Sequence, residues 1–227
     1  MKKHLILGLA ATALAAAALP IGAQPAPTLP GSKSVAAISG GTYQADAGHT
    51  LIAWKVDHFG FSPYTGLFGD ITGTLNLDPK KPAAASVDVT IPLSKLATAS
   101  AGLTAHMLRD AKEAGGKPDF FGSNPAPARF VSTKVTPQGK LKAKIAGNLT
   151  LNGVTRPVVL DAAFYGAGKA PAMMGGKENV GFTARATIKR SDFGIAYAVP
   201  AVSDEVRIRI TTEASVAKPA AAPGASK

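Results

Sequence analysis

KLKAKIAGNLTLNGVTRPVVLD, the stretch from Lys140 to Asp161, alternates apolar and polar residues on both sides of an Asn-Gly pair. Apolar or small residues occupy every second position from Leu141 to Leu151, with lysines between the first of them. A period of two is typical of a β-strand that buries one face and exposes the other. Asn152-Gly153 suits a two-residue type I′ turn, because both residue types tolerate positive φ. The stretch therefore predicts a long antiparallel hairpin.

The return arm of this hairpin keeps the alternation as far as Phe164. Val158, Leu160 and Ala162 stand on its apolar face, and Pro157 stands near its start, where a missing N–H group costs least. Both arms run about ten residues, which is longer than the usual strand of five or six. We interpret such long two-faced arms as part of a barrel rather than of a small sandwich.

Alternation of the same kind occurs on both sides of the hairpin. Further strands are expected over residues 50–58, 71–77, 87–91, 129–135, 180–188 and 206–210. Between the first two of them, Gly60 to Gly66 is expected to turn the chain. Between the third and fourth, Leu93 to Asp110 changes period and is expected to contain a helix that Ser94 or Thr98 caps. With the two hairpin arms, the sequence predicts an all-β protein of about eight strands with one helical excursion.

Eight antiparallel strands with one apolar face each can close into a barrel, which leaves no exposed edge. A barrel of this size is just wide enough to hold side chains or one slender ligand. Gly69, Gly73 and Gly147 fall inside the strands, as bending at the corners of a barrel requires. The order of strands alone also allows a two-sheet sandwich, but strand length and these glycines favour the closed antiparallel barrel.

The two ends of the chain differ in composition from the part between them. Residues 1–23 carry two lysines and then an apolar run up to Pro20, which is typical of a cleaved signal peptide and short for a membrane span. Residues 24–41 and 217–227 are rich in Pro, Ala, Gly and Ser, so we expect a flexible linker and a disordered tail. Residues 42–216 remain as a single barrel domain, long enough for a substantial core.

The chain is basic and has no cysteine. Its net charge is +11, and without Lys2 and Lys3 of the predicted signal peptide 23 basic residues face 14 acidic ones, which leaves +9. A basic surface favours anionic partners such as lipid head groups, cell-wall polymers or nucleic acid, or it is simply a solvated surface. Nucleic acid is not expected as a partner, because the chain is predicted to be exported and lacks an aromatic stacking platform among its basic residues. Disulfides and thiol chemistry are excluded.

Several motifs resemble those of the YceI-like polyisoprenoid-binding domain. In chain order they are Tyr43–Asp46 with His49 and Thr50, Val56–Gly60, Gly66–Phe68, His106–Arg109, Asp119–Phe121, Pro127–Phe130, Gly147–Thr155 and Arg190–Gly194. The resemblance implies a lipocalin-like barrel in the bacterial periplasm that encloses a long isoprenoid chain. The chain departs from the family at Asp110–Pro118, which is longer and richer in Gly and Lys and would alter the barrel mouth. It also has Thr50 in place of a serine, which keeps the hydroxyl.

His49 and His58, with Asp46 and Asp57 close in sequence, come nearest to a catalytic or metal cluster. A metal site needs three or four convergent ligands, and strand alternation puts Asp57 on the opposite face from His58. Hydrogen-bonded structural histidines are therefore favoured, and no metal, cofactor or catalytic residue is expected. The sequence has no nucleophile elbow, phosphate loop or dinucleotide fingerprint. An enzyme that modifies an isoprenoid head group through His49 or His58 is the alternative.

The expected function is that of an exported, non-enzymatic carrier or binding protein for a long-chain isoprenoid, of polyprenyl or quinone type. Small residues on the strands would leave volume for this ligand, and they are Ala53, Gly73, Ala143, Gly147, Ala162, Ala184 and Ala186. The residues expected to contact it are Ile52, Trp54, Val56, His58, Phe68, Ile71, Phe120, Phe121, Ala143, Ile145, Leu149, Leu160, Phe164, Phe182, Ala184 and Arg190.

Arg190 could contact an anionic head group, or it could fix a loop by pairing with Asp192, Asp204 or Glu205. The loop-fixing role is favoured. Transient contact with a membrane surface and a homodimer are further expectations. An interaction module without a ligand, its barrel filled by side chains, is a third hypothesis.

Overall fold

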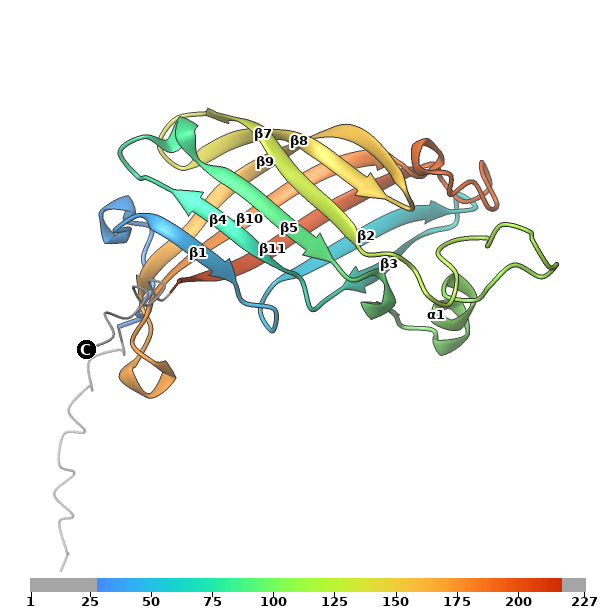
Figure 1. The fold of residues 1–227 in the computed structure, drawn as a ribbon, viewed down its shortest axis with the longest axis horizontal. Helices are drawn as coiled ribbons and strands as arrows, with labels where there is room; N and C mark the ends of the chain where they lie inside the picture. The colour runs from blue at the N-terminus through green and yellow to red at the C-terminus, as the bar shows by residue number, and fades with distance from the viewer. Residues whose placement is uncertain (1–27, 218–227) are drawn as a thin grey trace, which may run out of the picture.

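Eleven β-strands and one short α-helix make up the fold of residues 28–217, the part of the chain that the computed structural model describes (Figure 1). The strands are β1 (Gly41–Ala45), β2 (Leu51–His58), β3 (Ser62–Phe68), β4 (Thr72–Leu77), β5 (Ser86–Ile91), β6 (Leu96–Thr98), β7 (Ala128–Pro137), β8 (Lys142–Leu151), β9 (Val154–Lys169), β10 (Glu178–Lys189) and β11 (Glu205–Val216). The helix is α1 (Ala101–Met107), and short 3-10 turns are η1 (Val35–Ala37), η2 (Pro82–Ala84), η3 (Leu93–Lys95), η4 (Ala172–Met174) and η5 (Arg190–Phe193).

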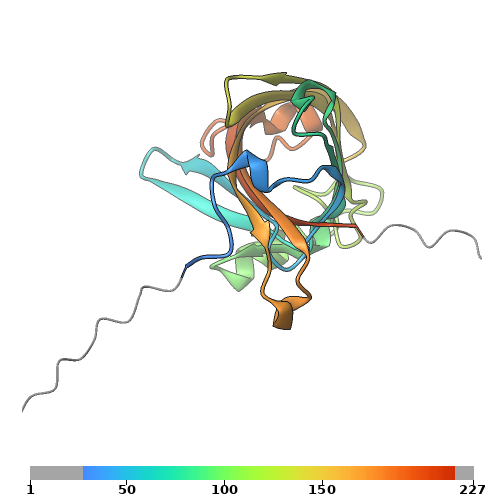
Figure 2. The same cartoon turned by 90° about the vertical axis from the view of Figure 1, so that its left-hand side faces the viewer.

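Eight of these strands close into a barrel. They are hydrogen-bonded in the order β1, β4, β5, β7, β8, β9, β10 and β11, and β11 pairs back with β1. Every one of these pairs is antiparallel. Seen from one end, the strands form a ring (Figure 2). The closed antiparallel eight-stranded barrel is confirmed, as is the helical excursion between the third and fourth expected strands, which are β5 and β7.

β11 is long enough to pair with two strands along the same edge. Its residues 207–211 pair with β2, and its residues 214–216 pair with β1. The strand expected over residues 50–58 therefore forms only half of this position in the barrel. β1 forms the other half and closes the ring. The sequence did not predict β1, because five residues with a glycine and two polar side chains show no clear period.

The expected turn from Gly60 to Gly66 is wrong. Only residues 59–61 form the tip, and β3 then pairs with β2 from His58 and Ser62 onward. Gly66 is a packing residue rather than a turn residue, because the indole of Trp54 lies where a side chain at position 66 would be. β3 pairs in turn with β6, so that β2, β3 and β6 extend the sheet beyond the ring.

The helix is shorter than the segment from Leu93 to Asp110 in which it was expected. α1 has seven residues, and the Ser100 Oγ caps it by accepting a hydrogen bond from the Leu103 N–H at 3.2 Å. The two residues expected as caps lie elsewhere, Ser94 in η3 and Thr98 at the end of β6. Pairing of β6 with β3 overrides the helical period in the first part of this segment.

The hairpin at Asn152-Gly153 is confirmed. Both residues have positive φ, +53° and +76°, and Leu151 pairs directly with Val154 across the turn. β8 has ten residues as expected, and β9 continues to sixteen. The lysines of β8 are exposed on the outside, while its larger apolar residues pack into the interior.

A buried tyrosine holds the seam between β1 and β11. Tyr43 is fully buried beside Val180 and Ala214, and its hydroxyl donates a hydrogen bond to the Glu178 carboxylate. The same carboxylate accepts the backbone N–H of Ser39 at 2.9 Å. Burial alone would raise the pKa of Glu178, but the hydrogen bonds from Ser39 and Tyr43 lower it below its ordinary value of 4.5. The ionised carboxylate is therefore the form that holds the seam.

Part of the predicted linker packs along this seam. Ser32 forms a β-bridge with Ala167, and Ile38 is buried in the same cluster as Tyr43. The predicted signal peptide, the first residues of the linker and the predicted tail from residue 218 lie outside the described residues, so the structure does not test them.

Leu149→Asp should lower the free energy of unfolding by about 3 kcal/mol or more, because it places a carboxylate among the apolar residues of the interior without a partner. The neighbouring substitution Asn148→Asp adds the same group on the exposed outer face and should change stability by less than about 0.5 kcal/mol. Urea denaturation measures both, and equal losses would contradict the inner and outer assignment of β8.

Tyr43→Phe should lower the free energy of unfolding at neutral pH by about 1–2 kcal/mol, because it removes the donor to Glu178. A folded-state pKa lower than the unfolded one gives stability that is present above pH 4.5 and is lost as pH falls through the folded value. The difference between the wild type and Tyr43→Phe should therefore shrink in acid. Tyr165→Phe, on an exposed side chain, is the control, and a difference that is constant down to pH 3 would contradict this assignment.

Candidate ligand-binding site

The interior of the barrel is lined by apolar side chains, most of which belong to connected clusters. The buried apolar residues of the described chain gather into four clusters. The clusters are centred on Tyr43 and Phe164, on Ile71 and Leu93, on Trp54 and Met107, and on Phe130 and Phe193. A domain of this size usually has one contiguous core. Here Phe68 and Val89 are among the half-buried residues that join three of the clusters, and only the cluster of Tyr43 and Phe164 stands apart.

A row of alanines lies between two of these clusters. Ala143, Ala162 and Ala184 are direct neighbours on β8, β9 and β10. Phe164 and its cluster lie on one side of this row along the strands, and the cluster of Phe130 lies on the other. Three methyl groups side by side leave the inner wall recessed at this level.

Larger residues next to the alanine row keep part of their surface accessible. Ile145, Leu160 and Phe182 are only half-buried, although each packs in a cluster of the interior. An interior filled to normal density would cover them. The recess and the partly accessible side chains make the interior beside the alanine row the candidate place for a slender apolar guest.

Not every small residue contributes to this space, which corrects the sequence analysis. The ring of Phe130 occupies the position of a side chain at Gly147, and the strand of Val89 does so at Gly73. Ala53 pairs with Arg209 and stands next to Lys55 on the outer face. The expected volume is therefore confined to the alanine row and its surroundings.

The predicted ligand residues fall into three groups. Ile145, Leu149, Leu160, Phe164 and Phe182 belong to the two clusters beside the alanine row, which itself contains Ala143 and Ala184. Ile52, Trp54, Val56, Phe68, Ile71, Phe120 and Phe121 belong to the two clusters at the α1 end of the barrel. His58 and Arg190 belong to neither group.

At the α1 end lies a cluster that we call the cap cluster, formed by Trp54, Leu96 and Met107 with the half-buried Tyr64, Phe120 and Phe121. The Phe121 N–H donates to the Met107 carbonyl oxygen at 3.1 Å, so the chain after α1 folds back onto the helix. β2, β3, β6 and α1 all supply residues, so this cluster packs the helix against the strands at that end.

Two polar atoms inside the cap cluster have no hydrogen-bond partner among the described residues. They are the indole Nε1 of Trp54 and the hydroxyl oxygen of Tyr64, whose rings lie 6.4 Å apart. A buried polar group without a partner costs about 1–3 kcal/mol. Such groups are uncommon in native proteins, so these two atoms mark a place where a small change should be tolerated.

A polar cluster lies beside the cap and was not singled out as a site in the sequence. The Asp119 carboxylate lies 2.7 Å from the His106 Nε2 and 3.1 Å from the Arg109 guanidinium. The hydrogen bond with His106 lowers the pKa of Asp119, and burial opposes this only in part. The His106 ring meets Phe120 and Tyr197 edge-on. The cluster therefore ties α1 to the loops at residues 119–121 and 194–199.

Arg190 has its guanidinium directed at backbone rather than at the lumen. It is buried and donates to the carbonyl oxygens of Ile195, Tyr197, Val202 and Ser203 at 2.8–3.3 Å. Burial lowers its pKa. This is a loop-fixing arrangement, with carbonyls in place of the carboxylate that the sequence suggested as its partner.

The two histidines of the enzyme hypothesis lie at opposite ends of β2. His49 Nδ1 lies 2.8 Å from the exposed Asp46 carboxylate, which raises the pKa of His49. His58 is exposed and packs edge-on against Phe59. Within residues 28–217, no group of three or more His, Cys, Asp or Glu side chains could hold a metal ion. The same residues contain no helix that is long and apolar enough to cross a bilayer.

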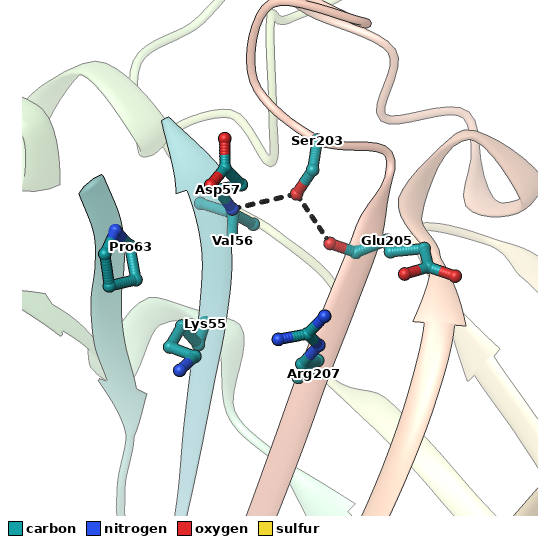
Figure 3. A pocket seen from close by; sticks show the side chains of 7 residues that line it. All are labelled: Lys55, Val56, Asp57, Pro63, Ser203, Glu205 and Arg207. Atoms are coloured by element: carbon teal, nitrogen blue, oxygen red, sulfur yellow. Dashed lines mark hydrogen bonds between the residues drawn. The ribbon is translucent and has the colours of Figure 1, made fainter. Parts of the chain in front are cut away.

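A surface pocket lies on the outer wall between β2 and β11 (Figure 3). Lys55, Asp57, Glu205 and Arg207 line it, and Ser203 Oγ accepts the Asp57 N–H at 2.9 Å and donates to the Glu205 carbonyl at 2.8 Å. Charged side chains suit water or a small polar molecule better than a prenyl chain. This pocket is therefore not the candidate lipid site, which we place in the interior beside the alanine row.

Comparison with known proteins gives consistent results. A model of the YceI-like domain family matches residues 43–214. A UPF0312 protein of Pseudomonas fluorescens Pf-5 is 37% identical over 175 residues, which covers 75% of this chain and 83% of the relative. The solved YCEI protein of Campylobacter jejuni is 30% identical with a TM-score of 0.59, over 71% of this chain and 90% of that one. A polyisoprenoid binding domain from Saccharophagus degradans has the same fold, with 13% identity and a TM-score of 0.52 over 77% and 98% of the two chains.

Tyr64→Phe should leave the free energy of unfolding of the ligand-free protein unchanged or raise it by about 1 kcal/mol, because it removes a buried hydroxyl that lacks a partner. Tyr43→Phe, which removes a bonded hydroxyl, is the contrasting variant and should destabilise. Thermal denaturation of both measures the difference. A loss of 1 kcal/mol or more in Tyr64→Phe would mean that its hydroxyl has a partner in solution.

Proposed function

The chain belongs to the YceI-like family, and on that premise we propose that it is a non-enzymatic binding protein that holds a long-chain isoprenoid, of polyprenyl or quinone type, in the barrel. The observation that carries the proposal is the recessed apolar wall around Ala143, Ala162 and Ala184. A flexible chain of repeated branched units fits a long narrow apolar lumen better than a compact polar substrate does. The polyisoprenoid binding domain that shares this fold supports the ligand class.

Burial of the ligand supplies enough free energy for stable binding. About 500 Å² of prenyl surface at ~25 cal/mol per Å² gives on the order of 12 kcal/mol gross. Ordering of the tail and lost overall freedom reduce this value considerably.

Further parts of the proposal rest on the sequence. The signal peptide predicted over residues 1–23 supports export to the periplasm, where a carrier of this kind would move a lipid between membranes or hold it for a partner. A homodimer stays a prediction. The enzyme alternative gains little from the geometry, since His49 and His58 lie at opposite ends of β2 and outside the lumen.

Turnover separates the two functions directly. The binding protein should return a bound prenyl compound chemically unchanged after prolonged incubation, as measured by mass spectrometry of the extracted lipid. A modified head group that disappears in His49→Ala or His58→Ala would establish the enzyme instead.

The double variant Ala143→Phe with Ala184→Phe should fold and lose at least about tenfold in affinity for a polyprenyl compound, because two rings fill the recess at a modest packing cost. Lys142→Phe with Arg185→Phe adds the same rings one residue away, on the outer face, and should bind as the wild type does. Calorimetric titration of delipidated protein measures affinity. Trp54 fluorescence should change on binding, since Trp54 lies in the cap cluster. Wild-type affinity in the folded Ala143→Phe, Ala184→Phe variant would overturn the lumen as the binding site.

A further inference from the structure

The two ends of the barrel differ in charge. At the end that Figure 2 faces, the segment before β1 meets the β4–β5, β7–β8 and β9–β10 connections. We call this the basic end. Its loops and strand ends carry seven exposed lysines, which are Lys33, Lys80, Lys81, Lys140, Lys142, Lys169 and Lys177. They face two carboxylates, Asp78 and Glu178, and the second is engaged by Ser39 and Tyr43.

The opposite end has no such excess of positive charge in the described chain. Its basic residues include Lys95, Arg109, Lys112, Lys117, Lys189 and Arg190, and its acidic residues include Asp70, Asp110, Glu113, Asp119, Asp192, Asp204 and Glu205. The two sets nearly cancel, and the guanidinium of Arg190 is buried against backbone carbonyls. The positive charge of the molecule is therefore polarised along the barrel axis.

The basic end also carries exposed apolar side chains at its most protruding loop. The β9–β10 hairpin extends beyond the ring (Figures 1 and 2), and its tip presents Met173, 93% exposed, and Met174, 66% exposed. Lys169 and Lys177 flank this tip on the two arms of the hairpin. Methionine side chains are long, flexible and apolar, so their transfer from water into an apolar phase lowers the free energy.

The lysines are arranged to meet a surface rather than a single ion. They come from four separate segments around the ring, so that no one loop holds the charge. An anionic plane can contact all of them at once, and each lysine near such a surface adds to the attraction. Apolar tips flanked by lysines are typical of proteins that lie on the interface of a bilayer.

We propose that the basic end docks on a bilayer that contains anionic phospholipid, with the lysines at the head groups and Met173 and Met174 inserted below them. A polyanion such as polyphosphate or a cell-wall polymer would satisfy the lysines, but it offers no apolar phase to the methionines. The bilayer accounts for both sets of side chains. The inference rests on the surface and not on the identity of the ligand, so that vesicle binding and polyprenyl binding can fail separately.

The experiment is flotation with vesicles of phosphatidylcholine alone or with phosphatidylglycerol. The protein is prepared without residues 1–23, because the predicted signal peptide would itself associate with lipid. Wild-type protein should float with the anionic vesicles and at least about tenfold less with the neutral ones, and association should weaken as salt is raised. Failure of the wild type to associate with anionic vesicles would overturn the proposal.

Two pairs of variants identify the docking end. Met173→Ser with Met174→Ser changes no charge and should lower vesicle association several-fold, whereas Phe61→Ser, which removes an exposed aromatic at the opposite end, should not. Lys81→Glu with Lys177→Glu should lower association by at least about tenfold, and Lys55→Glu with Arg185→Glu, the same charge change on the barrel wall, should lower it far less.

The outcomes are distinguishable. Two results together would assign the surface to a polyanion and overturn the bilayer. Vesicle association would fall in the lysine variant but not in the methionine variant, and the wild type would bind polyphosphate as strongly as it binds anionic vesicles. Equal loss in Phe61→Ser would overturn the choice of end. Circular dichroism on each variant shows that the barrel is intact.

Discussion

The structure depends on the pairing of β1 with β11. Without β1, β4 and the last residues of β11 would present unpaired backbone N–H and C=O groups, which is the hazard that closed barrels avoid. The pairing involves few residues, and the buried Tyr43 supports it through packing and through its hydrogen bond to Glu178. A short strand thus completes the ring, and one side chain fixes its position.

Most of the barrel could be predicted from the sequence because its strands are long and two-faced. Over β8 and β9 the lysines on one side and the aliphatic residues on the other leave one consistent register, and Asn152-Gly153 fixes the turn. Predictions from the sequence were wrong where contacts with residues far apart in the chain decide the local structure. Gly66 signals a turn locally, but its missing side chain admits the Trp54 ring, and Leu96 enters a strand because β3 lies beside it.

The candidate site was predictable as an apolar interior but not in its detail. Alternation identified which residues of β8, β9 and β10 face inward, and their pairing placed Ala143, Ala162 and Ala184 in one row. No local pattern could show that the Phe130 ring covers Gly147. Nor could it show that the Arg190 guanidinium donates its hydrogen bonds to backbone carbonyl oxygens of a loop. Both results depend on side chains that come from elsewhere in the chain.

The two ends of the barrel are held together by different kinds of contact. Backbone hydrogen bonds of β1 close the ring at one end. At the α1 end β2 pairs with β3, and β3 pairs with β6, while α1 is held by the packing of side chains around Trp54 and Met107. Displacing α1 therefore separates mostly apolar contacts, while displacing β1 breaks ladder hydrogen bonds of a closed sheet. One rim of the barrel is therefore held by backbone hydrogen bonds, and the other is held mainly by the packing of apolar side chains.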